Sequence, residues 1–345
     1  MINLKDLQFK QLEEMAVSME EAPFRGRQLF QRLYQNVSSF EEMTDLPAAF
    51  REKLAQSCHL GLLKLLRQQV SKLDGTRKFL FELSDGNAIE SVFMKYKYGN
   101  SVCLSSQAGC KMGCSFCASG LDGWKRNLTP GEMADQILAA ERVTGEKVNH
   151  VVVMGTGEPF DNYENLSSFL NIIHEKKGMN LSFRNITVST CGIVPKIRQF
   201  AEEFPQVNLA VSLHSPTDRL RSSMMPVNEV YSLAPLMEAC RAYCRRTSRR
   251  ITFEYTLVKG VNDGREQAEQ LAELLCGMLC HVNLIPLNRV EETGLATTSR
   301  KTAESFREYL EQRGIPVTIR RELGGDISGA CGQLRLETKR NRENF

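Results

Sequence analysis

The chain has 345 residues, of which 42% are hydrophobic and 25% are charged, and its formal net charge is +3. Because this length exceeds the size at which one hydrophobic core usually stops growing, we expect one large domain and a smaller one. The composition is that of a globular protein, no apolar stretch approaches membrane-spanning length, and charges interrupt the start of the chain where a signal peptide would be apolar; we therefore exclude a membrane protein and expect a cytoplasmic one.

Short helices are predicted over residues 1–60. Residues 24–35 have the apolar spacing of a helix. Pro47 lies where the first turn of another helix accepts a proline. We therefore expect a small N-terminal helical accessory domain over residues 1–60.

A short antiparallel meander is predicted next, over residues 61–97. Asp-Gly pairs at 74–75 and 85–86 separate segments of alternating polarity, and this dipeptide between such segments is a strong hairpin signal. We expect this segment to link the helical domain to the rest of the chain. The predicted strands are 68–73, 77–83 and 87–96.

Strand and helix alternate over residues 98–335. The intervening helical segments have the usual length of crossover helices, and Thr129, Pro130 and Glu132 form a capping box with proline at the first helical position. Six strand–helix units and a final strand predict an α/β fold with a parallel sheet, a partial TIM-like (β/α)6 barrel, followed by a basic tail over residues 336–345. The predicted strands are 101–106, 150–155, 185–190, 207–214, 251–258, 281–287 and 316–321.

Distinctive residues follow the carboxyl ends of these strands, where the chemistry of such folds collects. We therefore expect them to meet at one mouth of the barrel. They are the cysteines of GCKMGCSFCASG, Gly157 and Glu158 of MGTGEP, Ser189, the segment Ser212, Leu213 and His214, and Asn288.

Three cysteines of the first of these segments, Cys110, Cys114 and Cys117, have the spacing C-x3-C-x2-C. In a reducing compartment, metal binding or catalysis is favoured over a disulfide framework. One interpretation is a zinc site with Cys103 or Cys331 as the fourth ligand, although zinc sites usually pair two knuckles. The other is an iron–sulfur cubane, in which three cysteines leave one iron open for a ligand.

Most of the other cysteines need no special role. We expect them to be small buried hydrophobic side chains. They are Cys58, Cys191, Cys240, Cys244, Cys276 and Cys280.

The C-x3-C-x2-C loop resembles the signature of the radical S-adenosylmethionine (radical SAM) enzymes. This resemblance implies a 4Fe-4S cluster on Cys110, Cys114 and Cys117, whose open iron binds the amino and carboxylate groups of SAM. MGTGEP resembles the second cofactor-binding motif of that superfamily, with Glu158 near the amine of the cofactor. The remaining cofactor-binding residues implied are Gly157, Ser189, Ser212, Leu213, His214 and Asn288.

More co-linear segments, from FRGRQLFQ near the start to VTIRRELGGDISGACGQLR, resemble the RlmN/Cfr family of radical SAM RNA methyltransferases, and its RlmN branch most. The resemblance implies methylation of carbon 2 of an adenine in 23S ribosomal RNA, at adenosine 2503 of the peptidyl-transferase centre. In some members transfer RNA, at adenosine 37, is also a substrate. Carbon 2 lies between two ring nitrogens and is electron-poor, so it cannot attack SAM as a nucleophile, and the cofactor must supply radical chemistry.

The family mechanism implies roles for three more residues. Cys331 first accepts a methyl group from SAM, and a 5′-deoxyadenosyl radical then takes a hydrogen atom from that methyl group. The resulting carbon radical adds to the adenine, Glu90 is the proton acceptor, and Cys103 resolves the protein–RNA crosslink by attacking the sulfur of Cys331. A transient disulfide remains, which suits a compartment where disulfides are catalytic.

The implied partners are the RNA substrates and an electron donor such as flavodoxin, and we expect a monomer. The N-terminal helices and three basic clusters, 244–250, 319–323 and 339–343, are candidates for holding RNA. One alternative is a Cfr-like enzyme that methylates carbon 8. The other is a non-catalytic RNA-binding assembly factor with a structural metal.

Overall fold

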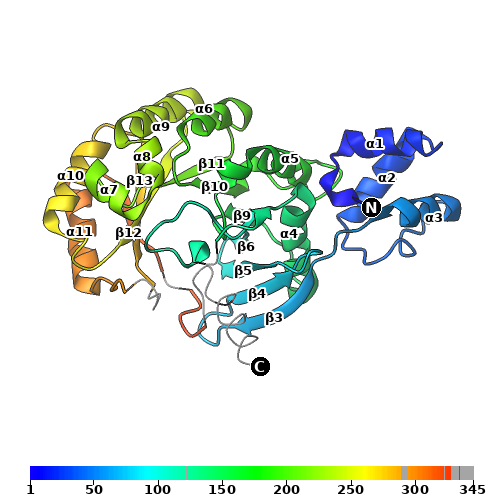
Figure 1. Ribbon diagram of the computed structural model, residues 1–345, viewed down its shortest axis with the longest axis horizontal. Coiled ribbons are helices and arrows are strands. Elements are labelled where there is room, and N and C mark those ends of the chain that lie inside the picture. The colour runs from blue at the N-terminus through cyan, green and yellow to red at the C-terminus, as the bar shows by residue number, and fades with distance from the viewer. Residues whose placement is uncertain (122, 289–293, 322, 328–333, 335–345) are drawn as a thin grey trace.

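The computed structural model describes residues 1–121, 123–288, 294–321, 323–327 and 334. Its main body is a ten-stranded sheet whose parallel strands are covered by helices, and a small helical module lies at one side (Figure 1). Within the described residues, no helix is both long enough and apolar enough to cross a membrane.

The small module is formed by the first 60 residues. Its helices pack their apolar sides together around side chains such as Leu12, Phe30 and Phe50, none of which is exposed. Two short strands pair in parallel, so the beginning of the module is bound to its end. The elements are β1 (Ile2–Asn3), α1 (Phe9–Ser18), α2 (Pro23–Leu33), α3 (Ala48–Ser57) and β2 (Cys58–His59).

Seven parallel strands form the larger part of the sheet, in the order in which they occur in the sequence. The predicted α/β fold is confirmed. The strands are β6 (Gly99–Cys103), β9 (His150–Val153), β10 (Ile186–Thr190), β11 (Asn208–Ser212), β12 (Ile251–Leu257), β13 (Cys280–Pro286) and β14 (Val317–Ile319).

Helices connect these strands on one face of the sheet (Figure 1). The crossover helices are α4 (Pro130–Thr144), α5 (Tyr163–His174), α6 (Val194–Glu203), α9 (Leu233–Thr247), α10 (Arg265–Leu275) and α11 (Arg300–Gln312), with α7 (Asp218–Met224) and α8 (Val227–Val230) before α9. The predicted capping box of α4 is present, because the Thr129 side chain accepts from the Glu132 amide at 3.2 Å and the Glu132 carboxylate accepts from the Thr129 amide at 3.0 Å.

The antiparallel meander continues the same sheet. Its strands are β3 (Lys64–Val70), β4 (Arg77–Glu82) and β5 (Ala88–Tyr96), and β5 pairs antiparallel with β6. Gly75 and Gly86 have φ values of +74° and +82°, as the predicted Asp-Gly turns require. β3 overlaps the predicted strand 68–73 but starts earlier, at Lys64. It ends at Val70 because the Ser71 amide closes a turn onto the Thr76 carbonyl at 2.8 Å.

A buried group of charges joins the helical module to α4. The Asp135 carboxylate, which is fully buried, accepts from the Lys5 ammonium, from the Arg142 guanidinium at 2.9 Å and from the Leu63 amide at 2.7 Å. Lys5 is 1% exposed. The first residues of the chain are therefore held against the first crossover helix.

Candidate functional site

The register of the sheet assigns the predicted site residues to a face. Paired residues on neighbouring strands point the same way, and so do residues two apart on one strand. Ser91 lies on the face covered by helices, since its hydroxyl donates to Gln136 of α4 at 2.8 Å. The opposite face bears Lys78, Glu90, Cys103, Ser189, Ser212 and Glu254.

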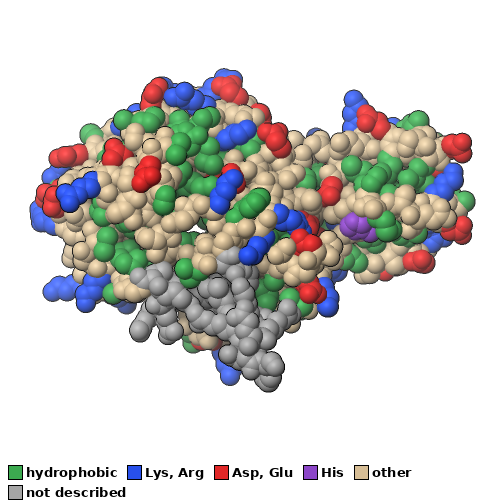
Figure 2. All heavy atoms as spheres, in the orientation of Figure 1, with side chains coloured by type: hydrophobic (Ala, Val, Ile, Leu, Met, Phe, Trp, Pro, Cys, Tyr) green, Lys and Arg blue, Asp and Glu red, His purple; other side chains and the backbone are tan. Residues whose placement is uncertain are grey.

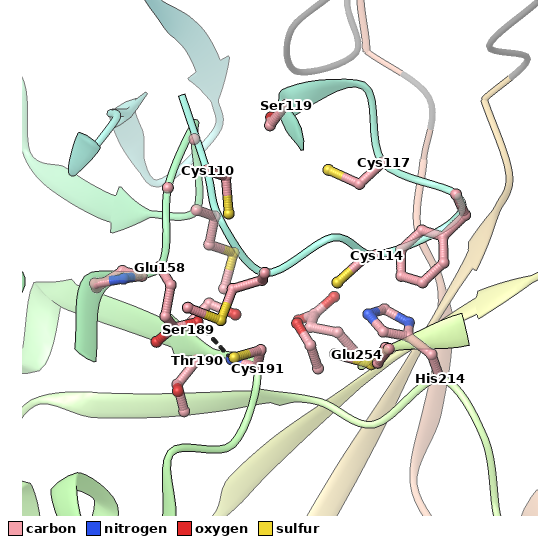
Figure 3. Close-up of a pocket in the computed structure, with 18 of the residues that line it drawn as sticks. Cys110, Cys114, Cys117, Ser119, Glu158, Ser189, Thr190, Cys191, His214 and Glu254 are labelled. Carbon is pink, nitrogen blue, oxygen red and sulfur yellow. Dashed lines mark hydrogen bonds between the residues drawn. The ribbon is translucent and has the colours of Figure 1, made fainter. Parts of the chain in front are cut away.

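A cavity of about 190 Å³ opens beyond the carboxyl ends of β9 to β13 (Figure 3). It brings together most of the residues predicted from the strand ends. The predicted residues that line it are Cys110, Cys114, Cys117, Gly157, Glu158, Ser189, Ser212 and His214. Residues not predicted for the site also line it, among them Met112, Phe116, Thr190, Cys191, Met225, Glu254 and Arg320.

The cysteine loop is fixed by backbone contacts. The Ser115 amide donates to the Met224 carbonyl at 2.9 Å, and Met112 and Phe116 pack against an apolar cluster that includes Met225. Gly109, at φ +81°, lies so close to Gly123 that a Cβ would come within 1.9 Å of its carbonyl oxygen. The loop therefore leaves β7 (Gln107–Ala108), passes the cavity and returns to β8 (Arg126–Asn127) on a defined path.

The three thiols of this loop face the cavity (Figure 3). Burial raises the pKa of Cys110 to about 11 and raises that of Cys114 further, and for each the neighbouring thiols add to the rise. As thiolates they would repel one another, so they need a shared positive charge. A donor set of three thiols fits an iron–sulfur cluster, whose ligands are thiolates.

Glu158 ties β9 to β10. One carboxylate oxygen accepts from the Phe160 amide at 2.9 Å and the other from the Cys191 amide at 2.7 Å. Burial raises the pKa of this carboxyl. The preceding Gly157, at φ +109°, lies against Gln107, whose Cβ would be 2.6 Å from an added Cβ. The second glycine of MGTGEP, Gly157, is therefore required by the close approach of two loops.

His214 is buried behind the cysteine loop. Its Nδ1 accepts from the Thr256 amide at 2.9 Å, and its ring packs edge-on against Phe116 at a centroid distance of 4.7 Å. Burial and the nearby Arg221 lower its pKa from 6.5 to about 3. The imidazole is therefore neutral, and because Nδ1 accepts, Nε2 carries the proton.

A row of polar side chains crosses the sheet beside the cavity, and two of them, Ser212 and Glu254, line it. Ser212, Glu254, Asn283 and Thr318 are paired across four neighbouring strands. The Asn283 amide donates to the Glu254 carboxylate at 2.8 Å. Burial raises the pKa of Glu254, and Arg320 opposes this rise. Glu254 and Arg320 therefore bring a carboxyl group and a guanidinium to the same cavity.

Arg221 connects the carboxyl ends of β10 and β11 through hydrogen bonds. Its guanidinium donates to the carbonyls of Cys191 at 2.6 Å, Ser212 at 3.2 Å and Leu213 at 3.2 Å, and to the side chain of Asn228 at 2.8 Å. The side chain is fully buried. These bonds join the ends of β10 and β11, which form one wall of the cavity.

Glu90 and Cys103 are buried and lie outside the lining of this cavity. The Glu90 carboxylate forms an ion pair with Lys78 at 3.1 Å, and Lys78 is fully buried. Cys103 is the last residue of β6 and pairs with Val92 of β5. Glu90 and Cys103 therefore lie on neighbouring strands with their side chains on the same face.

Two predicted residues, Leu213 and Asn288, are described but do not line the cavity, and a third is not described. Leu213 is fully buried and contributes its amide, which donates to the Glu254 carbonyl at 3.0 Å. Asn288 is exposed and does not line the cavity. Cys331 lies outside the described residues, and its role stays a prediction.

The other cysteines follow the prediction in part. Cys58, Cys240, Cys244 and Cys280 are buried as predicted. The prediction for Cys276 is wrong, because it ends α10 at the surface and is exposed. Cys191 is buried but lines the cavity.

Comparisons with known proteins agree with this geometry. Residues 104–275 match the radical SAM superfamily, and residues 2–60 match the ribosomal RNA large subunit methyltransferase N-terminal domain. The chain is 46% identical to a radical SAM methyltransferase from Sphaerobacter thermophilus, whose crystal structure superposes with a TM-score of 0.93 over 96% of this chain and 99% of that one. The fold and the three-cysteine loop thus define a radical SAM enzyme.

Two curated relatives identify the family. Both are named probable dual-specificity RNA methyltransferase RlmN. The protein of Lachnospira eligens is 52% identical over 97% of this chain and 96% of its own length, and that of Geobacillus kaustophilus is 52% identical over 98% and 93%. The chain belongs to the RlmN family of RNA methyltransferases. It is a SAM-dependent RNA methyltransferase, and its cofactors are a 4Fe-4S cluster and SAM.

Proposed function

We propose that this enzyme methylates carbon 2 of adenine in 23S ribosomal RNA, at adenosine 2503, and in transfer RNA, at adenosine 37. The observation that supports this most is that a three-thiol cavity lies at the end of a sheet whose same face bears Glu90 and Cys103. The relatives are named dual-specificity enzymes, which supports two RNA substrates.

The lining of the cavity fits a bound cluster and cofactor. Cys110, Cys114 and Cys117 would hold the cluster, and Glu158 and Glu254 are acids for an ammonium group. When bound, the two cofactors supply a methyl group and radical chemistry that an electron-poor carbon requires. Met112 and Phe116 cover the loop with apolar surface and exclude water from the site.

The chain's own thiols and acid would then complete the transfer. Cys331 would hold the methyl carbon as a thioether, and that carbon would bond to the adenine after one of its hydrogen atoms has been removed. Glu90, whose carboxylate lies 3.1 Å from the Lys78 ammonium, accepts the proton that leaves carbon 2. Cys103 attacks the sulfur of Cys331, which releases the methylated base and leaves a disulfide between the two cysteines.

The segment that leads to Cys331 begins on the meander. The Asp326 carboxylate accepts from the Ser71 hydroxyl at 2.5 Å and from the Lys72 amide at 2.8 Å, and the Gly324 amide donates to Asp74 at 2.9 Å. These bonds anchor it on the turn between β3 and β4. This anchor supports a reaction at the face of β4 to β6, where Glu90 lies.

The product identifies the carbon that is methylated. Anaerobically reconstituted enzyme is incubated with labelled SAM, a reductant and RNA from cells that lack this modification. Digestion and mass analysis should find 2-methyladenosine in ribosomal RNA and in transfer RNA. If 8-methyladenosine alone is found, the proposal fails and the carbon 8 alternative holds.

The division of work between the two cysteines has its own test. Cys103→Ala should accumulate protein covalently joined to RNA, because the crosslink cannot be resolved. Cys331→Ala should form none. Cys276→Ala, at an exposed thiol that ends α10 and does not line the cavity, is the control and should turn over normally. If neither variant of the pair accumulates an adduct in reduced, active enzyme, these roles are wrong.

We also propose that the enzyme is a monomer and that it takes electrons from a donor such as flavodoxin.

A further inference from the structure

The single tryptophan of the chain, Trp124, lies at the surface beside the cysteine loop. It is 44% exposed, and the neighbouring Leu121 is 46% exposed. Tryptophan is usually highly buried, because its ring contributes a large apolar area. An indole left open beside a reaction cavity is therefore a candidate for contact with the substrate.

The backbone on both sides of Trp124 is fixed. Gly123 is in close contact with Gly109, and the Lys125 amide donates to the Ala108 carbonyl at 2.8 Å. Arg126 then forms ion pairs with two carboxylates, one of which is Glu132 of α4 at 2.7 Å. The segment that carries the indole is therefore held against Ala108 and Gly109, the residues before Cys110.

Positive charge accompanies the ring. The Lys111 ammonium lies 5.6 Å from the ring centroid of Trp124 and 2.8 Å from the Asp161 carboxylate. Lys111 is half exposed, and Lys125 is exposed as well. An aromatic face next to ammonium groups is the combination with which proteins hold unpaired nucleotides, because bases stack on the ring while phosphates meet the cations.

Lys111 also locates this surface relative to the reaction. Its neighbours in sequence, Cys110 and Met112, both line the cavity. A target adenine that leaves its stack and enters the cavity keeps its covalent bonds to the nucleotides on either side. At least one of those nucleotides must then lie at the rim of the cavity, and Cys110 and Met112 on either side of Lys111 line that cavity.

We propose that Trp124, with Lys111 and Lys125, forms a stacking platform for the base next to the target adenine. This proposal rests on the proposed function, since it takes RNA to be the molecule that enters the cavity. An acidic electron-donor protein is the other partner that an indole with lysines would suit. RNA is favoured because a nucleotide must occupy the rim during the reaction, whereas electrons tunnel through protein and the donor can bind elsewhere.

The test compares Trp124→Ala, Trp124→Phe and the control Tyr98→Ala in cluster-loaded enzyme. Tyr98 is a more exposed aromatic residue, at 66%, and lies in the turn at the amino end of β6, away from the cavity. Affinity for a labelled hairpin RNA that contains the target adenine is measured directly, and turnover is measured with dithionite as the only reductant.

Trp124→Ala should weaken RNA binding about 5- to 150-fold, the range expected for the loss of one base–aromatic stack. It should raise KM with little change in kcat. Trp124→Phe should retain most of the affinity, and Tyr98→Ala should match the wild type. When the base on one side of the target adenine is removed to leave an abasic nucleotide, the difference between the wild type and Trp124→Ala should disappear.

Several results would overturn the platform. Equal RNA affinity of Trp124→Ala and the wild type is one, and a difference that persists with abasic nucleotides on both sides is another. A defect seen with flavodoxin and absent with dithionite would assign the surface to the reductant. Loss of 5′-deoxyadenosine formation in the absence of RNA would assign Trp124 to the cofactor site. If the wild type binds the hairpin but produces no methylated adenine, the proposed function fails. The comparison of RNA affinity between the wild type and Trp124→Ala still decides whether Trp124 is a stacking platform.

Discussion

Replacing Asp135 with leucine should destabilise the protein far more than replacing its partner Lys5 with methionine. Asp135 is fully buried and serves three donors, the Lys5 ammonium, the Arg142 guanidinium and the Leu63 amide. Removal of Lys5 leaves the carboxylate with two partners. Removal of Asp135 leaves a buried ammonium without its counter-ion and a backbone amide without an acceptor.

The magnitudes follow from these contacts. Breaking a buried pair so that one charge is left behind costs about 3–5 kcal/mol, and the orphaned Leu63 amide adds about 1 kcal/mol or more. We expect the free energy of unfolding to fall by about 4–6 kcal/mol in Asp135→Leu and by about 1–2 kcal/mol in Lys5→Met, where Arg142 still compensates the carboxylate. The double variant should recover at least half of the loss, because both buried charges of the pair are gone.

The assay is guanidinium unfolding followed by circular dichroism under anaerobic conditions. Burial already lowers the pKa of Lys5 below 10.5. A lysine with a lowered folded pKa binds fewer protons when folded than when unfolded, so stability increases as the pH rises toward 10.5. Asp135→Leu should therefore be least destabilised in alkaline buffer. Equal losses for the two single variants, or a double variant no better than Asp135→Leu, would refute this reasoning.

Three more predictions concern the cavity. The folded pKa of His214, about 3, lies below its unfolded value of 6.5, so stability that is present above pH 6.5 is lost as the pH falls. Between pH 6.5 and pH 5.5, in urea unfolding, the wild type should lose about 1 kcal/mol relative to His214→Gln, because the unfolded histidine is already half protonated at pH 6.5. Gly157→Ala must accommodate a Cβ 2.6 Å from that of Gln107 at φ +109° and should lose at least tenfold in SAM affinity by equilibrium dialysis, whereas Gly145→Ala, at φ +71° with open space around it, should keep wild-type affinity. Arg221→Met removes the donor shared by carbonyls at the ends of β10 and β11 and should weaken SAM binding about tenfold or more, while iron content stays near the wild-type value; unchanged affinity would show that the wall does not depend on this side chain.

Local patterns in the sequence predicted much of the fold. The capping box at Thr129 and Glu132 marks the start of α4, and the apolar β-branched runs mark the parallel strands. That the meander joins the sheet was not predictable in the same way, because the pairing of β5 with β6 is a matter of edge geometry and not of local pattern. Asp-Gly at 74–75 predicts a turn between two strands, but it does not predict which other part of the chain this turn contacts.

The cavity was predictable where a residue ends a strand and less so elsewhere. Ser189 and Ser212 were found by their position. Glu254 was missed although it carried a signal, since an acid in the middle of the apolar strand ITFEYTL has no reason to be there without a partner. Cys191 gave no such signal, because a thiol inside the fold is usually only a small hydrophobic side chain. Asn288 is exposed and does not line the cavity, because a position soon after a strand does not fix the direction of a side chain, and its role in cofactor binding stays a prediction.

The pairing of β1 with β2 has a consequence for how the protein assembles during translation. All residues of that small ladder have been synthesised once His59 is made, so the helical module can close by itself. Lys5, however, cannot reach its counter-ion until Asp135 in α4 has left the ribosome. In the nascent chain the helical module can therefore be folded while the Lys5 ammonium is still hydrated. That ammonium is dehydrated only when α4, the first crossover helix of the barrel, packs against the module.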